Sequence, residues 1–143
     1  MNYVEEILEN KDSEEDKFYA IADIIGSKEA ESSFNSLKVE EKNIHMIDVL
    51  LEEINNGGLD EYFFNTGGKY SQDTINVLKG IKQFELAEIL HQASIIYYGD
   101  TNEEDKFDML NEFDEKIYEQ VSFEALYKSC LEYLGSYRQK FDE

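Results

Sequence analysis

Apolar residues recur three and four positions apart through most of the chain, which is the pattern of helices that bury one face. A short apolar stripe of this kind begins at Tyr3. No stretch of the chain shows the alternation of apolar and polar residues that is typical of a β-strand. The predicted inner faces are Phe18, Ile21, Ala22 and Ile25; Ile44, Ile47, Val49, Leu50, Leu51 and Ile54; Ile75, Leu78 and Ile81; Phe107, Leu110, Phe113 and Ile117; and Phe123, Leu126, Tyr127, Cys130, Leu131, Leu134 and Tyr137. The pattern predicts an all-α fold, one compact domain of about six to eight helices over residues 1–143.

Helix ends have to be read from glycines and capping residues, because the chain contains no proline. Ser13 is expected to cap a helix that runs to Gly26. Ser71 and Ser122 are placed to cap two later helices, and residues 101–104 have the spacing of a capping box. The segment Phe84–Tyr98 is apolar almost all round, so we expect this helix at the centre of the core.

Two glycine pairs enclose a short aromatic segment in the middle of the chain. Asn56-Gly57-Gly58 and Gly67-Gly68 can adopt the positive φ that ends a helix, and Asn56 and Asn65 can cap the turns that follow. Tyr62 and Phe63 are expected to be buried between the pairs, as is Leu131 on the last helix. A polar ligand pocket is the alternative interpretation of this stretch.

The run from Asn56 to Asn65, of the form NGG-x(3)-[FY]-F-x-N, resembles the domain family named for DNA mimic protein 19. The similarity extends over about residues 39–137. The family is typical of bacteria, and most of its members have no known function. One is an acidic, dimeric, all-helical protein that resembles double-stranded DNA and occupies the DNA-binding surface of a transcription regulator. The resemblance therefore implies an interaction module that can form a homodimer.

Charge decides which partners are suitable. The chain has 33 Asp and Glu against 13 Lys and Arg, a net charge of −20, so we expect no direct binding of nucleic acid or of an anionic membrane. With 41% hydrophobic and 13% aromatic residues, the chain can still bury a core. The absence of a long apolar run, a basic leader or paired cysteines favours a cytoplasmic protein.

Candidate catalytic and metal-binding groups are few. His45, His91 and Cys130 each lie in a helical stripe without a neighbouring base or ligand. The Gly67–Ser71 segment lacks the first glycine of a phosphate loop, and Asp100–Asn111 lacks the glycine and the final glutamate of a calcium loop. We therefore expect no enzyme activity, no cofactor and no metal.

One charge pattern stands out near the C-terminal end. Glu104, Asp108, Glu112, Glu115 and Glu119 recur at spacings of four, four, three and four, which places them on one face of a helix over residues 102–119. A break near residues 111–114 would bend that face, and a purely solvated face is the alternative interpretation. A second set, Glu41, Asp48 and Glu52, is expected on the outer face of the helix that ends at Asn56.

Two functions fit these observations. In the first, the carboxylates imitate DNA phosphates and occupy the basic surface of a DNA-binding protein such as a transcription regulator. In the second, the chain is an antitoxin or immunity-type protein that neutralises a basic partner. Competition with duplex DNA separates them, because only a mimic should compete.

Overall fold

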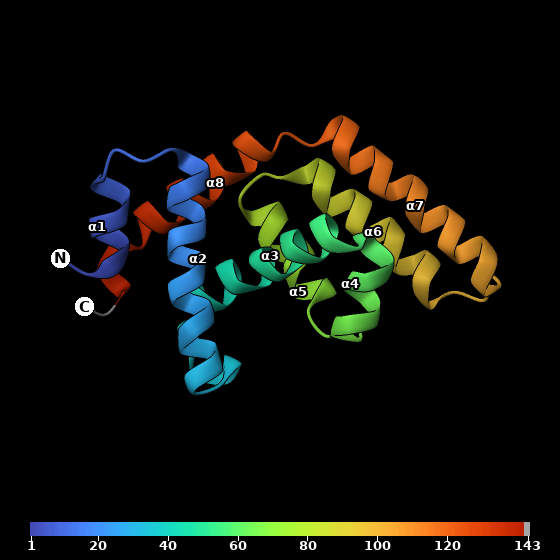
Figure 1. Cartoon of the computed structure of the whole chain (residues 1–143), viewed down its shortest axis with the longest axis horizontal. Coiled ribbons are helices and arrows are strands. Elements are labelled where there is room, and N and C mark those ends of the chain that lie inside the picture. Colours follow the sequence, from blue (N-terminus) through green and yellow to red (C-terminus); the bar gives the residue numbers. More distant parts are fainter. Residues whose placement is uncertain (142–143) are drawn as a thin grey trace. The chain divides into compact units, whose positions relative to one another are not determined.

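The computed structural model describes residues 1–141 and confirms the all-α prediction, since those residues form eight α-helices, two short 3-10 helices and no β-strand (Figure 1). Contacts divide the chain into two compact units. Met1–Asp48 and the segment from Ser122 onward form the first unit, and Val49–Val121 forms the second. The single domain over residues 1–143 stays a prediction, and its last two residues lie outside the described range.

In the first unit, α2 packs against α8, and α1 packs against both. Phe18, Ile21, Ala22 and Ile25 of α2 have no exposed surface, which confirms that predicted inner face. The elements of this unit are α1 (Tyr3–Glu9), α2 (Glu14–Glu31), η1 (Phe34–Ser36), the first part of α3 (Val39–Asn56), α8 (Phe123–Ser136) and η2 (Arg138–Lys140).

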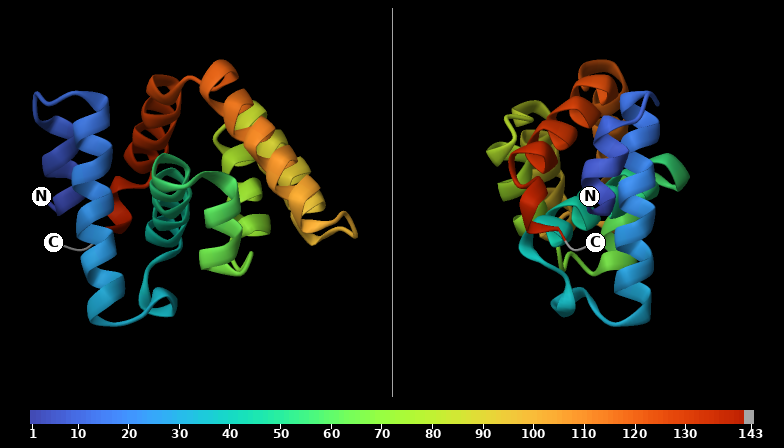
Figure 2. Two further views of the ribbon diagram at one scale, coloured as in Figure 1. Left: turned by 45° about the vertical axis from the view of Figure 1, so that its right-hand side comes forward. Right: turned by 90° about the vertical axis from the view of Figure 1, so that its left-hand side faces the viewer.

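Asn2 fastens the two ends of the first unit together. Its side-chain oxygen accepts a hydrogen bond from the Glu5 backbone N–H at 2.9 Å and so caps α1. Its side-chain nitrogen donates to the carbonyl oxygens of Arg138 at 2.6 Å and Phe141 at 3.0 Å. The beginning and the end of the described chain therefore lie side by side, as both views in Figure 2 show.

In the second unit, α6 contacts α4, α5 and α7 and is the central helix. Leu86, Ala87, Ile89, Leu90 and Ala93 of α6 are buried. The opposite side is not buried, because Phe84, Ile95 and Tyr98 are each more than half exposed. The elements of this unit are the rest of α3, α4 (Gly58–Thr66), α5 (Ser71–Gly80), α6 (Phe84–Tyr98) and α7 (Glu103–Gln120).

Some helix ends differ from those predicted. α2 continues through Gly26 to Glu31, because that glycine has no positive φ and a glycine inside a helix costs only about 1 kcal/mol. Ser71 is the first residue of α5 and not its cap, since its hydroxyl donates to the Gly68 carbonyl. Ser13 and Ser122 cap their helices as predicted.

Candidate acidic interaction surface

α7 is one unbroken helix, so the break near residues 111–114 that would have bent its face does not occur. Its cap is Asn102 and not Thr101, because the Asn102 side-chain oxygen accepts a hydrogen bond from the Asp105 backbone N–H at 2.9 Å. Three acidic residues follow in the first turn, where they interact favourably with the positive end of the helix dipole. The helix can therefore carry many carboxylates and still form a regular N-terminus.

The five predicted carboxylates of α7 are all exposed, and we call them the acidic face: Glu104, Asp108, Glu112, Glu115 and Glu119. The side of α7 that packs into the second unit carries Leu110 and Ile117, which have no exposed surface. At 100° per residue the acidic face points directly away from this buried side. Figure 2 shows α7 lying along α6 as a continuous ribbon.

The lysines of α7 do not neutralise the negative charges of the acidic face. Lys106 is directed to Glu103, with 3.7 Å between its Nζ and the carboxylate, and Lys116 lies 5.1 Å over the ring of Phe113. Within residues 1–141, no acidic-face carboxylate forms an ion pair or a side-chain hydrogen bond. These groups are therefore available to an external basic surface.

Only one residue of the second predicted acidic set lies on the outer face of its helix. Glu41 is only 2% exposed and Asp48 only 5%, so those two positions were wrong, while Glu52 is exposed. The Glu41 carboxylate receives hydrogen bonds from the hydroxyl of Tyr3 at 2.8 Å, Nζ of Lys28 at 2.7 Å and the backbone N–H of Lys38 at 3.0 Å. The negative charge of Glu41 is therefore paired with Lys28 inside the first unit.

Only one glycine of the first pair holds a positive φ. Gly58 has φ +84°, while Gly57 has φ −155° and ψ −2°. The predicted capping by asparagine is wrong at α4, because no side chain of the preceding turn caps that helix. Asn65 instead donates to the carboxylates of Glu53 at 2.9 Å and Glu61 at 3.4 Å. Both glycines of the second pair have positive φ, as predicted.

α7 supplies the cap that the turn lacks. The Asp114 carboxylate accepts a hydrogen bond from the Leu59 backbone N–H at 2.9 Å, at the start of α4. One helical turn later, the Tyr118 hydroxyl donates to the Ile54 carbonyl at 3.2 Å, in the last turn of α3. Two side chains of α7 thus hold both sides of the Asn56-Gly57-Gly58 turn. The sequence shows that Asp114 and Tyr118 are four residues apart, but it does not show that Asp114 binds a residue 55 positions earlier in the chain.

Burial makes Asp114 sensitive to pH. Its pKa is raised above the usual value, first by burial and then by the nearby Asp60, although the hydrogen bond from Leu59 acts in the opposite direction. A raised pKa in the folded state means that protonation favours folding. The resulting stability is complete below the unfolded pKa and is lost as pH rises through the folded pKa.

We expect D114A to lower the free energy of unfolding by about 1 kcal/mol, the usual cost of a lost helix cap. D114N keeps an oxygen for the Leu59 N–H and carries no charge, so at pH 7 it should be at least as stable as the wild type. Its advantage should shrink on acidification, as the wild-type carboxyl becomes protonated. Urea unfolding at pH 7 and pH 4 tests this, and equal losses for D114A and D114N would contradict it.

The predicted burial of the aromatic segment is confirmed. Tyr62 and Phe63 have no exposed surface, and the ring of Phe63 stacks on that of Tyr97 with 5.0 Å between centroids. Tyr98 fills the space beside Gly68, where a Cβ atom would overlap its ring. Burial raises the pKa of Tyr62 to about 12. These features assign a packing role to the stretch.

The candidate catalytic side chains lie on three different helices. His91 is exposed on α6, whereas His45 lies on α3 and is half-buried. Cys130 is buried on α8, and burial raises the pKa of its thiol to about 12, which disfavours the nucleophilic thiolate. Among residues 1–141, no cluster of three or more His, Cys, Asp or Glu side chains could hold a metal ion.

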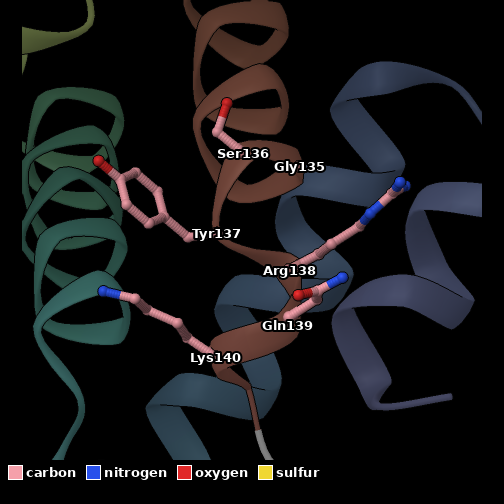
Figure 3. A pocket seen from close by; sticks show the side chains of 6 residues that line it. All are labelled: Gly135, Ser136, Tyr137, Arg138, Gln139 and Lys140. Carbon is pink, nitrogen blue, oxygen red and sulfur yellow. The ribbon is translucent and has the colours of Figure 1, made fainter.

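An open hollow of about 380 Å³ lies at the end of α8 and is lined by residues 135–140 (Figure 3). Lys140 and Arg138 point to opposite sides of the segment in this view. Nζ of Lys140 lies 4.0 Å from the carboxylate of Glu40, and the Ser136 hydroxyl donates to the Glu132 carbonyl. Lys140 and Ser136 thus contact neighbours in the fold, and the labelled side chains do not converge on one point in this view.

Within residues 1–141, no helix is long and apolar enough to cross a membrane.

Comparison with known proteins supports the resemblance seen in the sequence. No curated protein and no solved structure shows significant similarity to the chain. The family model described as DMP19-like protein matches residues 35–139, which include the Asn56-Gly57-Gly58 turn and all of α7. The chain therefore belongs to the DMP19-like protein family.

Proposed function

We propose that this chain is a non-enzymatic interaction protein that occupies the DNA-binding surface of a DNA-binding protein, such as a transcription regulator. The observation that carries the proposal is the acidic face, whose five carboxylates are all exposed on one unbroken helix. They extend over about 22 Å at 1.5 Å per residue. A surface that binds DNA must neutralise a comparable row of negative charges.

The spacing of the carboxylates fits an imitation of one part of a groove edge. Residues four apart on a helix are separated by about 6 Å along its axis. Phosphates of one strand advance about 3.4 Å per nucleotide along the duplex axis and lie further apart along the winding backbone. One helix therefore replaces a short stretch of phosphates. Glu52, which is also exposed, or a second copy in a homodimer would have to extend the imitation.

Family membership supports the same function, since the family takes its name from a DNA mimic. The net charge of −20 favours a basic partner and opposes direct contact with DNA. The cytoplasm is the compartment we propose, because a DNA-binding partner would be encountered there.

The test is competition for a purified basic DNA-binding protein that the chain captures. Duplex DNA should displace the chain from this partner at low salt. Neutralising the acidic face (E104Q, D108N, E112Q, E115Q and E119Q together) should weaken binding at least about tenfold, because several charge contacts of a few tenths of a kcal/mol or more are lost at once. The complex should also weaken as salt is added.

A matched control removes five exposed acids from the first unit: Glu9, Asp12, Asp23, Glu31 and Glu132. This variant has the same net charge as the acidic-face variant, so equal weakening would show that only total charge matters. Simultaneous binding of DNA and the chain to the partner would rule out mimicry. A basic partner that does not bind DNA would favour the antitoxin or immunity-type function.

A further inference from the structure

α7 carries a repeated combination of acidic and aromatic residues. Glu104, Phe107 and Asp108 have the same spacing as Glu115, Tyr118 and Glu119, eleven residues further on. We call these two sets the acid–aromatic clusters. Eleven residues are close to three helical turns, so the clusters lie on nearly the same side of α7, about 16 Å apart.

Both aromatic rings of the clusters are open to solvent. Phe107 is 52% exposed, although the sequence predicted its burial, and Tyr118 is 56% exposed. Lys106 occupies the inward position beside Phe107, with its side chain only 15% exposed. The Tyr118 hydroxyl donates to the Ile54 carbonyl at 3.2 Å, so this ring is held in place while more than half of it remains exposed.

A face made only to repel or imitate DNA does not need exposed rings. Exposed aromatic surface next to carboxylates instead suits a group that is planar, cationic and able to bond two oxygens at once. The arginine guanidinium meets all three requirements, because it stacks on aromatic rings and donates parallel hydrogen bonds to carboxylates. Lysine offers a strongly hydrated point charge and cannot make the same fit.

We propose that the two acid–aromatic clusters bind two arginines of one helix of a protein partner. A partner helix that lies along α7 presents residues eleven apart at the same distance of about 16 Å. A second copy of this chain cannot supply them, since Arg138 is its one arginine and its charge is −20. The proposal rests on the proposed function and specifies the partner side chains that the acidic face recognises.

Synthetic helical peptides provide the probe. The test peptide carries two arginines eleven residues apart in an otherwise neutral alanine-based helix, and a second peptide carries two lysines at the same positions. A third peptide carries two arginines nine residues apart, which places them on opposite sides of the helix. Binding to the full chain is measured by fluorescence anisotropy at low salt. The first peptide should bind at least about threefold tighter than either of the others.

Variants of the chain test each part of a cluster. F107A and Y118A should each weaken the two-arginine peptide about threefold to fivefold, whereas Y118F, which keeps the ring, should retain the preference for arginine. F84A is the matched aromatic control, because Phe84 is 60% exposed on α6 of the same unit. E115Q should weaken binding more than E112Q, since both remove one acidic-face charge but Glu112 is outside the clusters.

Equal binding of the arginine and lysine peptides would overturn the proposal, as would equal effects of F107A and F84A or of E115Q and E112Q. Circular dichroism and thermal melting of each variant should be measured to check that the helices are intact. The peptides involve no DNA, so the two proposals fail separately. An arginine preference without DNA competition would contradict mimicry alone, and DNA competition without that preference would contradict the clusters alone.

Discussion

Replacing Gly58 with alanine is expected to destabilise the chain by about 2–3 kcal/mol. Gly58 has φ +84°, and an L-residue in the left-handed region costs about 1–2 kcal/mol. A Cβ atom there would also overlap the carboxylate of Asp114, which caps α4 through the Leu59 N–H. Losing that cap costs about 1 kcal/mol more. Urea unfolding followed by circular dichroism measures the total.

G57A is the matched control one residue earlier. Gly57 has a negative φ, but an added Cβ would overlap Cγ of Glu61 and come within 2.9 Å of its Cβ, so the exposed side chain of Glu61 has to shift. We expect G57A to cost less than G58A, because Gly57 is not in the left-handed region. In a D114A background the cost of G58A should fall by about 1 kcal/mol, because the overlap with the carboxylate is gone. Equal losses for G57A and G58A would show that the left-handed turn is not needed.

Helical periodicity was sufficient to predict most of the buried positions, although Phe107 and Tyr137, which were predicted on inner faces, are 52% and 40% exposed. The segment Phe84–Tyr98 forms α6 with both predicted ends, because a dense apolar run begins and stops there abruptly. The five acidic-face residues lie on one exposed side of a helix as predicted, since only the regular rise and rotation of a helix is required. Its exposure follows from its position opposite Leu110 and Ile117.

Features that depend on contacts between distant segments could not be predicted. Phe107 was expected inside, but Lys106 lies at that side and places its charge near Glu103. Glu41 was expected outside on the grounds of its charge, yet it is buried because Tyr3, Lys28 and Lys38 satisfy it. A sequence shows which residues can share a helix face and does not show which donors another helix will bring to a carboxylate.

Replacing Glu41 with alanine is expected to lower the free energy of unfolding by about 3 kcal/mol. The substitution removes the carboxylate that accepts hydrogen bonds from the Tyr3 hydroxyl, the Lys38 N–H and the Lys28 ammonium. Breaking a buried ion pair costs about 3–5 kcal/mol, and the lower end applies because the Lys28 side chain is 35% exposed. K28M should cost at least as much, because it leaves the buried Glu41 carboxylate without its cation, whereas the Lys28 ammonium left by E41A is partly exposed to water.

The pH dependence provides an independent check on Glu41. Burial alone would raise the pKa of this carboxyl, but hydrogen bonds from Lys28, Lys38 and Tyr3 outweigh it and lower the pKa below the usual value of 4.5. A lowered pKa in the folded state contributes stability that is present above the unfolded pKa and is lost as pH falls through the folded pKa. The stability difference between wild type and E41Q should therefore be constant from pH 7 to about 5 and shrink below about 4.5. Because both proteins carry the same other acids, general charge repulsion largely cancels from this difference, and a difference that stays constant down to pH 3 would show that the ionised carboxylate does not stabilise the first unit.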